Sequence, residues 1–172
     1  MWTTNYIISQ ICMVATMGIF SISMFTKSKK IILVNSAINS FLYSIHYFLL
    51  GGYTAVFLNL ISVLRGVFFY FDDRDGLDQN YLSLTFILLS LTAVSLTTYS
   101  SIVDLLPILS ISLYTISIWQ KNIKFYRFAA LLGSILFIVY NFILGSIMGV
   151  LSEAILVVIE IVGIKKLYKK EI

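Results

Sequence analysis

Long runs of apolar residues follow one another along the whole chain, each separated from the next by a short polar or glycine-containing stretch. An α-helix rises about 1.5 Å per residue, so a bilayer core of about 30 Å requires about 20 helical residues. Seven runs have about this length and carry few ionisable side chains. We expect membrane-spanning helices at residues 5–26, 31–50, 53–71, 81–99, 102–120, 128–144 and 147–164. The pattern predicts an all-α, polytopic membrane protein.

The composition supports this fold class. Of the 172 residues, 59% are hydrophobic and 12% are charged, whereas a soluble domain averages about 25% charged residues. A core of this size cannot bury so much apolar surface, so the surplus must face lipid. The sequence has no phosphate-binding glycine loop, no Cys/His metal spacing and no Gly-x-Ser-x-Gly motif. We therefore expect no cofactor, no metal and no nucleic-acid partner.

Lysine and arginine residues are concentrated on one side of the predicted membrane. With the N-terminus outside, the basic segments at 27–30, 121–127 and 165–170 all lie inside, and no Lys or Arg lies in an external segment. Cytoplasmic loops carry an excess of these residues, which favours this orientation. The acidic loop at 72–80 also lies inside, but acidic residues contribute little to the rule.

Two glycine-containing hairpins, at Gly51 and Gly145, lie 94 positions apart in similar sequences. A shift of 94 residues also aligns Lys27 with Lys121, Lys30 with Lys124, Ser40 with Ser134, Phe48 with Phe142, Leu50 with Leu144 and Val56 with Val150. We therefore expect two parallel three-helix repeats joined by a linker helix, a 3+1+3 arrangement. The predicted divisions are 1–71, 72–100 and 101–172. In transporters built from such repeats, the substrate site lies between the repeats near the middle of the bilayer.

Three motifs carry a resemblance to a known family. They are His46-Tyr47-Phe48-Leu49-Leu50-Gly51 with Arg65 downstream, Asp104-Leu105-Leu106-Pro107, and Asn141-Phe142 with Gly145-Ser146 and Glu153. In this order they resemble the bacterial inner-membrane YgjV family over most of the chain. The resemblance implies a multi-pass protein of the bacterial inner membrane, here with its N-terminus outside and its C-terminus in the cytoplasm. The likeness to the sugar-transporting SWEET proteins and to PnuC-type carriers of vitamin precursors is one of architecture.

Glu153 and Asn59 are the first candidates for a functional site. Each lies eight residues past its turn glycine, which corresponds to a depth of about 12 Å. An acidic residue at mid-helix costs about 3 kcal/mol on insertion, and intramembrane acids usually face a cavity or a partner. We expect both side chains to contact a solute or a proton. The alternative is a hydrogen-bonded carboxyl group that ties helices together.

Four further residues lie on the helices that enter the hairpins. His46 lies five residues before Gly51, and Asn141 lies one position from its counterpart in the second copy. Histidine titrates near neutral pH and could couple a proton to transport, although a hydrogen-bonded interface histidine is the commoner case. Tyr43 and Tyr140 are candidates for the cavity wall.

A second group of charges lies deeper. Under the shift of 94 residues, Arg65 aligns one position away from Glu160, so their depths are nearly equal. We expect them to pair across the repeat interface, either as a static ion pair or as an inner gate. Asp104, near the outer rim, either closes the cavity or caps the fifth helix.

These features favour a transporter of small solutes, with a central polar cavity and with proton coupling left open. A central carboxylate favours a small polar or cationic solute, or protons, over an anion. The alternative is a membrane interaction or assembly protein that transports nothing. An enzyme is least favoured, because the only histidine lies near the outer face with no nucleophile at a suitable spacing. The predicted partners are the lipid bilayer and the solute, and a homo-oligomer is left open.

Overall fold

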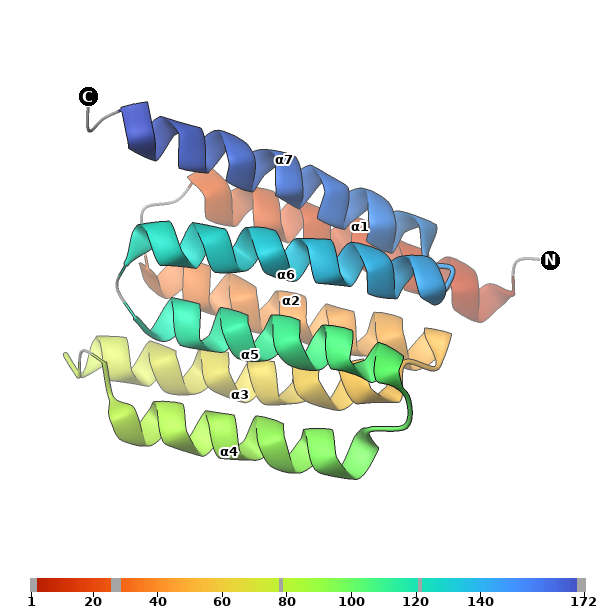
Figure 1. The fold of residues 1–172 in the computed structure, drawn as a ribbon, viewed down its shortest axis with the longest axis horizontal. Helices are drawn as coiled ribbons and strands as arrows, with labels where there is room; N and C mark the ends of the chain where they lie inside the picture. The colour runs from red at the N-terminus through yellow and green to blue at the C-terminus, as the bar shows by residue number, and fades with distance from the viewer. Residues whose placement is uncertain (1–2, 26–28, 78, 121, 170–172) are drawn as a thin grey trace.

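The structure is a computed structural model that describes residues 3–25, 29–77, 79–120 and 122–169 (Figure 1). Within these ranges it contains seven α-helices, one short 3-10 helix and no strand. The helices are α1 (Thr4–Phe25), α2 (Lys29–Leu50), α3 (Tyr53–Arg74), α4 (Tyr81–Thr98), α5 (Leu105–Trp119), α6 (Ile123–Ile143) and α7 (Ile147–Lys169), with the 3-10 helix η1 (Ile102–Asp104) before α5. The predicted all-α fold class is confirmed.

Six of the described helices, α2 through α7, are long and apolar enough to cross a membrane, α5 together with η1. Helix α1 contains a shorter apolar stretch, Thr4–Phe20, in its described part. The span predicted at 5–26 therefore stays a prediction. Residues 27–28, 78, 121 and 170, which belong to the predicted charged segments, lie outside the described residues.

Several helices extend beyond their predicted bounds. Helix α3 continues to Arg74 rather than ending at residue 71, α6 begins at Ile123 rather than at residue 128, and α7 continues to Lys169 rather than ending at residue 164. Lys and Arg are good helix formers, so the basic residues next to the apolar runs of α6 and α7 continue the helix rather than ending it. The start of α6 is set by Asn122, whose side chain accepts hydrogen bonds from the backbone N–H groups of Lys124 and Phe125.

The two glycine hairpins have the same backbone structure. Gly51 and Gly145 have positive φ angles of 80° and 70°, a conformation that glycine adopts without steric cost. The N–H groups of Gly52 and Ser146 each donate to the carbonyl five residues earlier, on Tyr47 and Asn141, at 2.9 and 2.8 Å. Both turns lie at the same end of the bundle, on the right in Figure 1. We call this the hairpin end and the opposite end, where α2 and α6 begin, the basic end.

Six of the helices form a closed ring. In the described residues α1 contacts α2, α2 contacts α3, α5 contacts α6, and α6 contacts α7. Contacts of α3 with α5 and of α1 with α7 complete the ring, whereas α4 lies outside against α3 and α5 (Figure 1). The ring places side chains from six helices around one central space.

The polarity of the bundle suits lipid rather than water. Many buried side chains are Ser, Thr or Asn, whereas large apolar side chains such as Leu82 and Leu96 on the peripheral α4 are about four-fifths exposed, at 82% and 79%. Hydroxyl groups on α4 donate to carbonyl groups of their own helix, as Ser90 does to Phe86. The outer surface is therefore apolar and the interior is polar.

Candidate functional site

A cavity of about 160 Å³ lies inside the ring of six helices. Its wall includes polar side chains from α2, α3 and α7: Asn39, Tyr43, Asn59, Arg65, Glu153 and Glu160. The volume is close to the roughly 150 Å³ of a cavity known to hold benzene, so a small solute or several water molecules would fit. The cavity also reaches Ile32 and Tyr126, near the starts of α2 and α6. It therefore extends from the middle of the bundle toward the basic end.

Glu153 and Asn59 line this cavity from opposite sides of the predicted repeat interface. The Glu153 side chain on α7 accepts a hydrogen bond of 3.2 Å from the Tyr43 hydroxyl on α2, and the residue is 4% exposed. Asn59 on α3 donates to the carbonyl oxygen of Ala55 on its own helix at 2.9 Å. The structure thus brings Tyr43, Asn59 and Glu153 together at the cavity wall, and their contact with a solute stays a prediction.

Arg65 also lines the cavity and is 3% exposed. Its Nη1 donates to the Thr115 hydroxyl on α5 at 2.9 Å, and its guanidinium carbon lies 5.1 Å from the centre of the Tyr114 ring. No Asp or Glu among the described residues forms an ion pair with it. Arg65 is a buried cation held by a hydroxyl group and an aromatic face.

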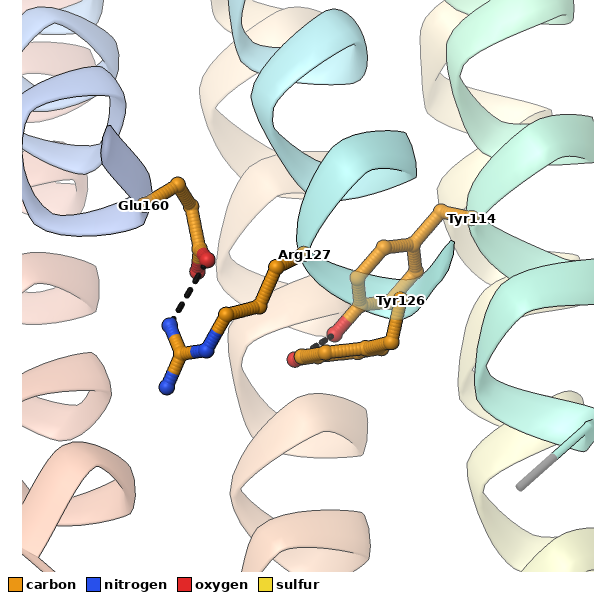
Figure 2. Close-up of polar contacts among 4 residues, drawn as sticks. All are labelled: Tyr114, Tyr126, Arg127 and Glu160. Carbon is orange, nitrogen blue, oxygen red and sulfur yellow. Dashed lines mark hydrogen bonds and ion pairs between the residues drawn. The ribbon is translucent and has the colours of Figure 1, made fainter. Parts of the chain in front are cut away.

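The expected pair between Arg65 and Glu160 is replaced by another one. Glu160 on α7 pairs with Arg127 on α6, with 2.8 Å between Oε2 and Nη1 (Figure 2). Sequence reasoning missed Arg127 because residues 121–127 were assigned to a loop. Since α6 begins at Ile123, Arg127 lies in its second turn and faces α7. The pair lies within the predicted second bundle, so it does not bridge the two repeats.

Two local features complete this rim of the cavity. The Tyr114 and Tyr126 hydroxyls lie 3.2 Å apart beside the ion pair (Figure 2). Gly163 leaves room for the Arg127 side chain, because a Cβ at that position would collide with the guanidinium. The basic end of the cavity is thus bounded by one ion pair and one tyrosine pair.

A compact group of polar side chains lies between the cavity and the hairpin end. We call it the hairpin cluster and define it by Ser9, His46, Tyr47, Asn141 and Ser146, all of which are essentially fully buried. The His46 ring nitrogens contact the Ser9 carbonyl at 2.9 Å and the Ser146 hydroxyl at 3.2 Å. Asn141 Nδ2 donates to the Tyr47 hydroxyl at 3.2 Å. These bonds connect α1, α2 and α6 with the turn before α7.

Three predicted cavity residues belong to this layer instead. His46 and Asn141 are members of the hairpin cluster, and Tyr140 packs edge-on against Tyr47 with the ring centres 5.4 Å apart. None of the three lines the cavity. Depth along a helix does not specify the direction in which a side chain points, so these residues lie outside the cavity wall, and their contact with a solute stays a prediction.

Asp104 acts as a helix cap. Its Oδ2 accepts hydrogen bonds from the N–H groups of Ser100 and Ser101 at 2.9 and 3.0 Å, and from the Ser100 hydroxyl at 2.9 Å. It does not line the cavity. These bonds form part of a capping box with Ser101 at the start of η1, whereas the Asp104 side chain makes no cap hydrogen bond to α5.

Sequence reasoning also missed Asn39, which is buried in the cavity wall with no hydrogen-bond partner for Oδ1. A signal was present in the sequence. Ser36, Asn39, Ser40 and Tyr43 are spaced by three and four residues, and Asn59, Ser62 and Arg65 by three. Such spacings place side chains on one face of a helix. In the described residues no group of three or more His, Cys, Asp or Glu side chains could hold a metal ion.

The family model Imp-YgjV, described as bacterial inner membrane protein, matches residues 7–171, almost the whole chain. No curated protein and no solved structure matches the chain.

Proposed function

Because the chain belongs to the Imp-YgjV family of bacterial inner membrane proteins, we propose that the cavity is the solute site of a small membrane transporter. The observation that supports this most directly is a hollow inside an apolar bundle that reaches both a buried carboxyl group, Glu153, and a buried guanidinium, Arg65. Ionisable side chains within a membrane are costly and mark solute pathways or proton relays. The sequence-level prediction of a small polar solute at Asn59 and Glu153 is retained in this proposal.

The helix contacts support a 3+1+3 arrangement in which α1–α3 and α5–α7 are the two repeats and α4 is the linker. The identical turns at Gly51 and Gly145 support it as well. Rocking of one bundle against the other would alternately open the two ends, as in other transporters with repeats. The hairpin end would be closed in the described state, because Tyr47–Asn141 and His46–Ser146 bonds connect the bundles there.

The proposed orientation keeps the N-terminus outside and the C-terminus in the cytoplasm. The two termini lie at opposite ends of the bundle (Figure 1), and the basic segments of the sequence flank the end at which α2 and α6 begin. Cytoplasmic faces carry such an excess of Lys and Arg. The cavity would then extend toward the cytoplasm.

The second candidate function is a membrane assembly protein that transports nothing. It is favoured by the Tyr43–Glu153 hydrogen bond, which ties α2 to α7. Against it, the chain packs polar side chains closely in the hairpin cluster but leaves a cavity one layer below. We infer no enzymatic activity, because His46 lies outside the cavity and both of its ring nitrogens are engaged.

Uptake into proteoliposomes tests the transport proposal. The purified chain would be reconstituted and the entry of glycerol, choline, glycine and lactate compared with protein-free liposomes. We expect at least one solute to enter faster with the protein. Glu153→Gln should slow that entry about tenfold, because a hydrogen bond to a charged group contributes at least about 1.5 kcal/mol.

Ser90→Ala is the matched control, since Ser90 lies partly exposed on the peripheral α4 and bonds to a carbonyl of its own helix. It should leave uptake unchanged. If none of the four solutes enters faster than in protein-free liposomes, or if Glu153→Gln transports as fast as the wild type, the transport role of this cavity is refuted.

A further inference from the structure

We propose that Arg65 binds a carboxylate group, so that the solute of this cavity is a small carboxylate that also carries a hydrogen-bond donor. The proposal deepens the transport function and rests on it only for the movement of the solute. Binding at Arg65 can be measured without any transport.

The Arg65 guanidinium is a buried cation with hydrogen-bond donors to spare. A guanidinium has several N–H donors in a planar fork and stays charged at any physiological pH. In the described residues, its one hydrogen bond is from Nη1 to the neutral Thr115 hydroxyl. The ring of Tyr114 covers one face. The remaining donors belong to a side chain in the cavity wall that is almost fully buried.

The buried acidic side chains of the described residues all bond to groups other than Arg65. Glu160 pairs with Arg127, and Asp104 caps the helix at the hairpin end. Glu153 accepts a hydrogen bond from Tyr43. It lies eight residues past Gly145, whereas Arg65 lies 14 residues past Gly51, so the two side chains differ in level by about 9 Å. A buried charge without a partner is unfavourable. A ligand that brings the missing negative charge would relieve this cost.

Arg65 and the cavity around it identify the anion. Arginine binds carboxylate and phosphate groups through paired, parallel hydrogen bonds. The same cavity is lined by Glu153 and Glu160, so a doubly charged phosphate would be repelled more strongly than a singly charged carboxylate. The volume of about 160 Å³ also limits the ligand to a few heavy atoms. A small monocarboxylate fits both restrictions.

Asn39 offers a second contact, to the part of the ligand away from its carboxylate. The Asn39 Oδ1 atom is a buried acceptor without a partner. Asn39 lies 12 residues before Gly51 and Arg65 lies 14 residues after it, so on antiparallel α2 and α3 their levels differ by about 3 Å. Together with Glu153, this acceptor suits a hydroxyl or ammonium group. The expected ligand is therefore a hydroxy acid or an amino acid rather than a simple cation.

Thermal stability in detergent measures the binding with defined probes. Lactate and glycine carry a carboxylate together with a hydroxyl or ammonium donor. Lactamide and glycinamide have an uncharged carboxamide in place of the carboxylate. We expect lactate or glycine to raise the unfolding midpoint of the wild type and the two amides to leave it unchanged. Binding of lactate alone would indicate a hydroxyl donor, and binding of glycine alone would indicate an ammonium donor.

Variants at two arginines of α3 provide the contrast. Arg65→Gln should weaken binding of the acid about ten- to a hundredfold, because a charge-assisted pair is lost, and Arg65→Lys should retain part of it. Arg74→Gln is the matched control, since Arg74 is exposed on the same helix and pairs with Asp75. It should bind like the wild type.

A structural role of Arg65 would appear in the ligand-free protein. Because its charge has no acidic partner, Arg65→Gln should unfold at the same temperature as the wild type or higher. If it unfolds at a clearly lower temperature, or if the amides bind as well as the acids, the carboxylate site is refuted. Failure of both acids to shift the wild-type midpoint refutes it as well.

The outcome also separates this proposal from the transport function. Binding of an acid that depends on Arg65, without uptake into proteoliposomes, would support the carboxylate site and refute transport. Uptake of glycerol or choline that is unchanged in Arg65→Gln would support transport and refute the carboxylate site.

Discussion

The hairpin cluster and the cavity are adjacent layers of the same six helices, and both are rich in polar side chains. In the hairpin cluster, His46 uses both ring nitrogens, and Asn141 bonds to Tyr47 and to the Phe137 carbonyl. In the cavity, Asn59 bonds back to its own helix, and Asn39 leaves an acceptor without a partner. Asn141 Oδ1, like Asn39 Oδ1, has no partner among the described residues. The first layer connects the two bundles by hydrogen bonds, and the second surrounds a space that a ligand could occupy.

The difference shows that polarity alone does not identify a site in a membrane bundle. Both layers contain buried residues that would be costly in lipid. Each layer has one buried amide oxygen without a partner in the described part of the chain, on Asn141 and on Asn39. What separates the layers is that the hairpin cluster packs closely between the helices, whereas the second layer surrounds a cavity. Close packing contributes stability, and polar groups around a cavity can contribute binding.

Removal of one partner of the ion pair at the cavity rim should have the largest effect on stability. Arg127→Gln leaves Glu160 buried without its partner, which should cost about 3 kcal/mol. The double variant Arg127→Gln with Glu160→Gln should recover most of this loss. Reversible unfolding in mixed detergent measures both. A loss in the double variant as large as in the single one would contradict the pairing.

An asparagine in each layer gives the next test. Asn141→Leu removes the bond to Tyr47 on α2 and a bond to Phe137 within its own helix. It should cost about 1–2 kcal/mol, because one interhelical bond contributes about 1 kcal/mol in membranes and the buried Tyr47 hydroxyl loses this donor. Asn59→Leu removes a bond within its own helix and should cost less than about 0.5 kcal/mol. Equal losses of unfolding free energy in the two variants would contradict the difference between the hairpin cluster and the cavity wall.

Two glycines provide the smallest contrast. A Cβ at Gly149 would collide with the Asn141 side chain, whereas a Cβ at Gly18 meets nothing nearby. Gly149→Ala should destabilise the protein by about 1–2 kcal/mol through overpacking of the hairpin cluster. Gly18→Ala should stabilise it slightly, by about 0.5 kcal/mol, because alanine is the better helix former. Thermal unfolding compares the two, and a neutral Gly149→Ala would contradict the close packing.

The parts of the site that could be predicted from the sequence are those that depend on position along one helix. Counting from Gly51 and Gly145 identified Asn59 and Glu153, and both line the cavity. The same counting placed Arg65 and Glu160 at similar depths but predicted the wrong partner for Glu160. A partner depends on helix rotation and on which helices are neighbours, and neither is a property of a single helix.

The sequence by itself determined the helices and their turns. A run of about 20 apolar residues must form a helix in lipid, because every backbone polar group has to be satisfied within the segment. A glycine between two such runs supplies the positive φ angle that the turn requires. Both are local requirements, so they can be recognised without knowledge of the neighbouring helices.

The tertiary structure alone decided which polar layer is packed and which is hollow. Depth counted along a helix does not by itself specify how that helix is rotated about its axis or which helices are its neighbours. Closure of the ring brings His46 and Asn141 together in the hairpin cluster. It leaves Arg65 in the cavity wall, where no acidic side chain of the described residues forms an ion pair with it. The reason is physical: satisfaction of a buried polar group is a property of several helices at once.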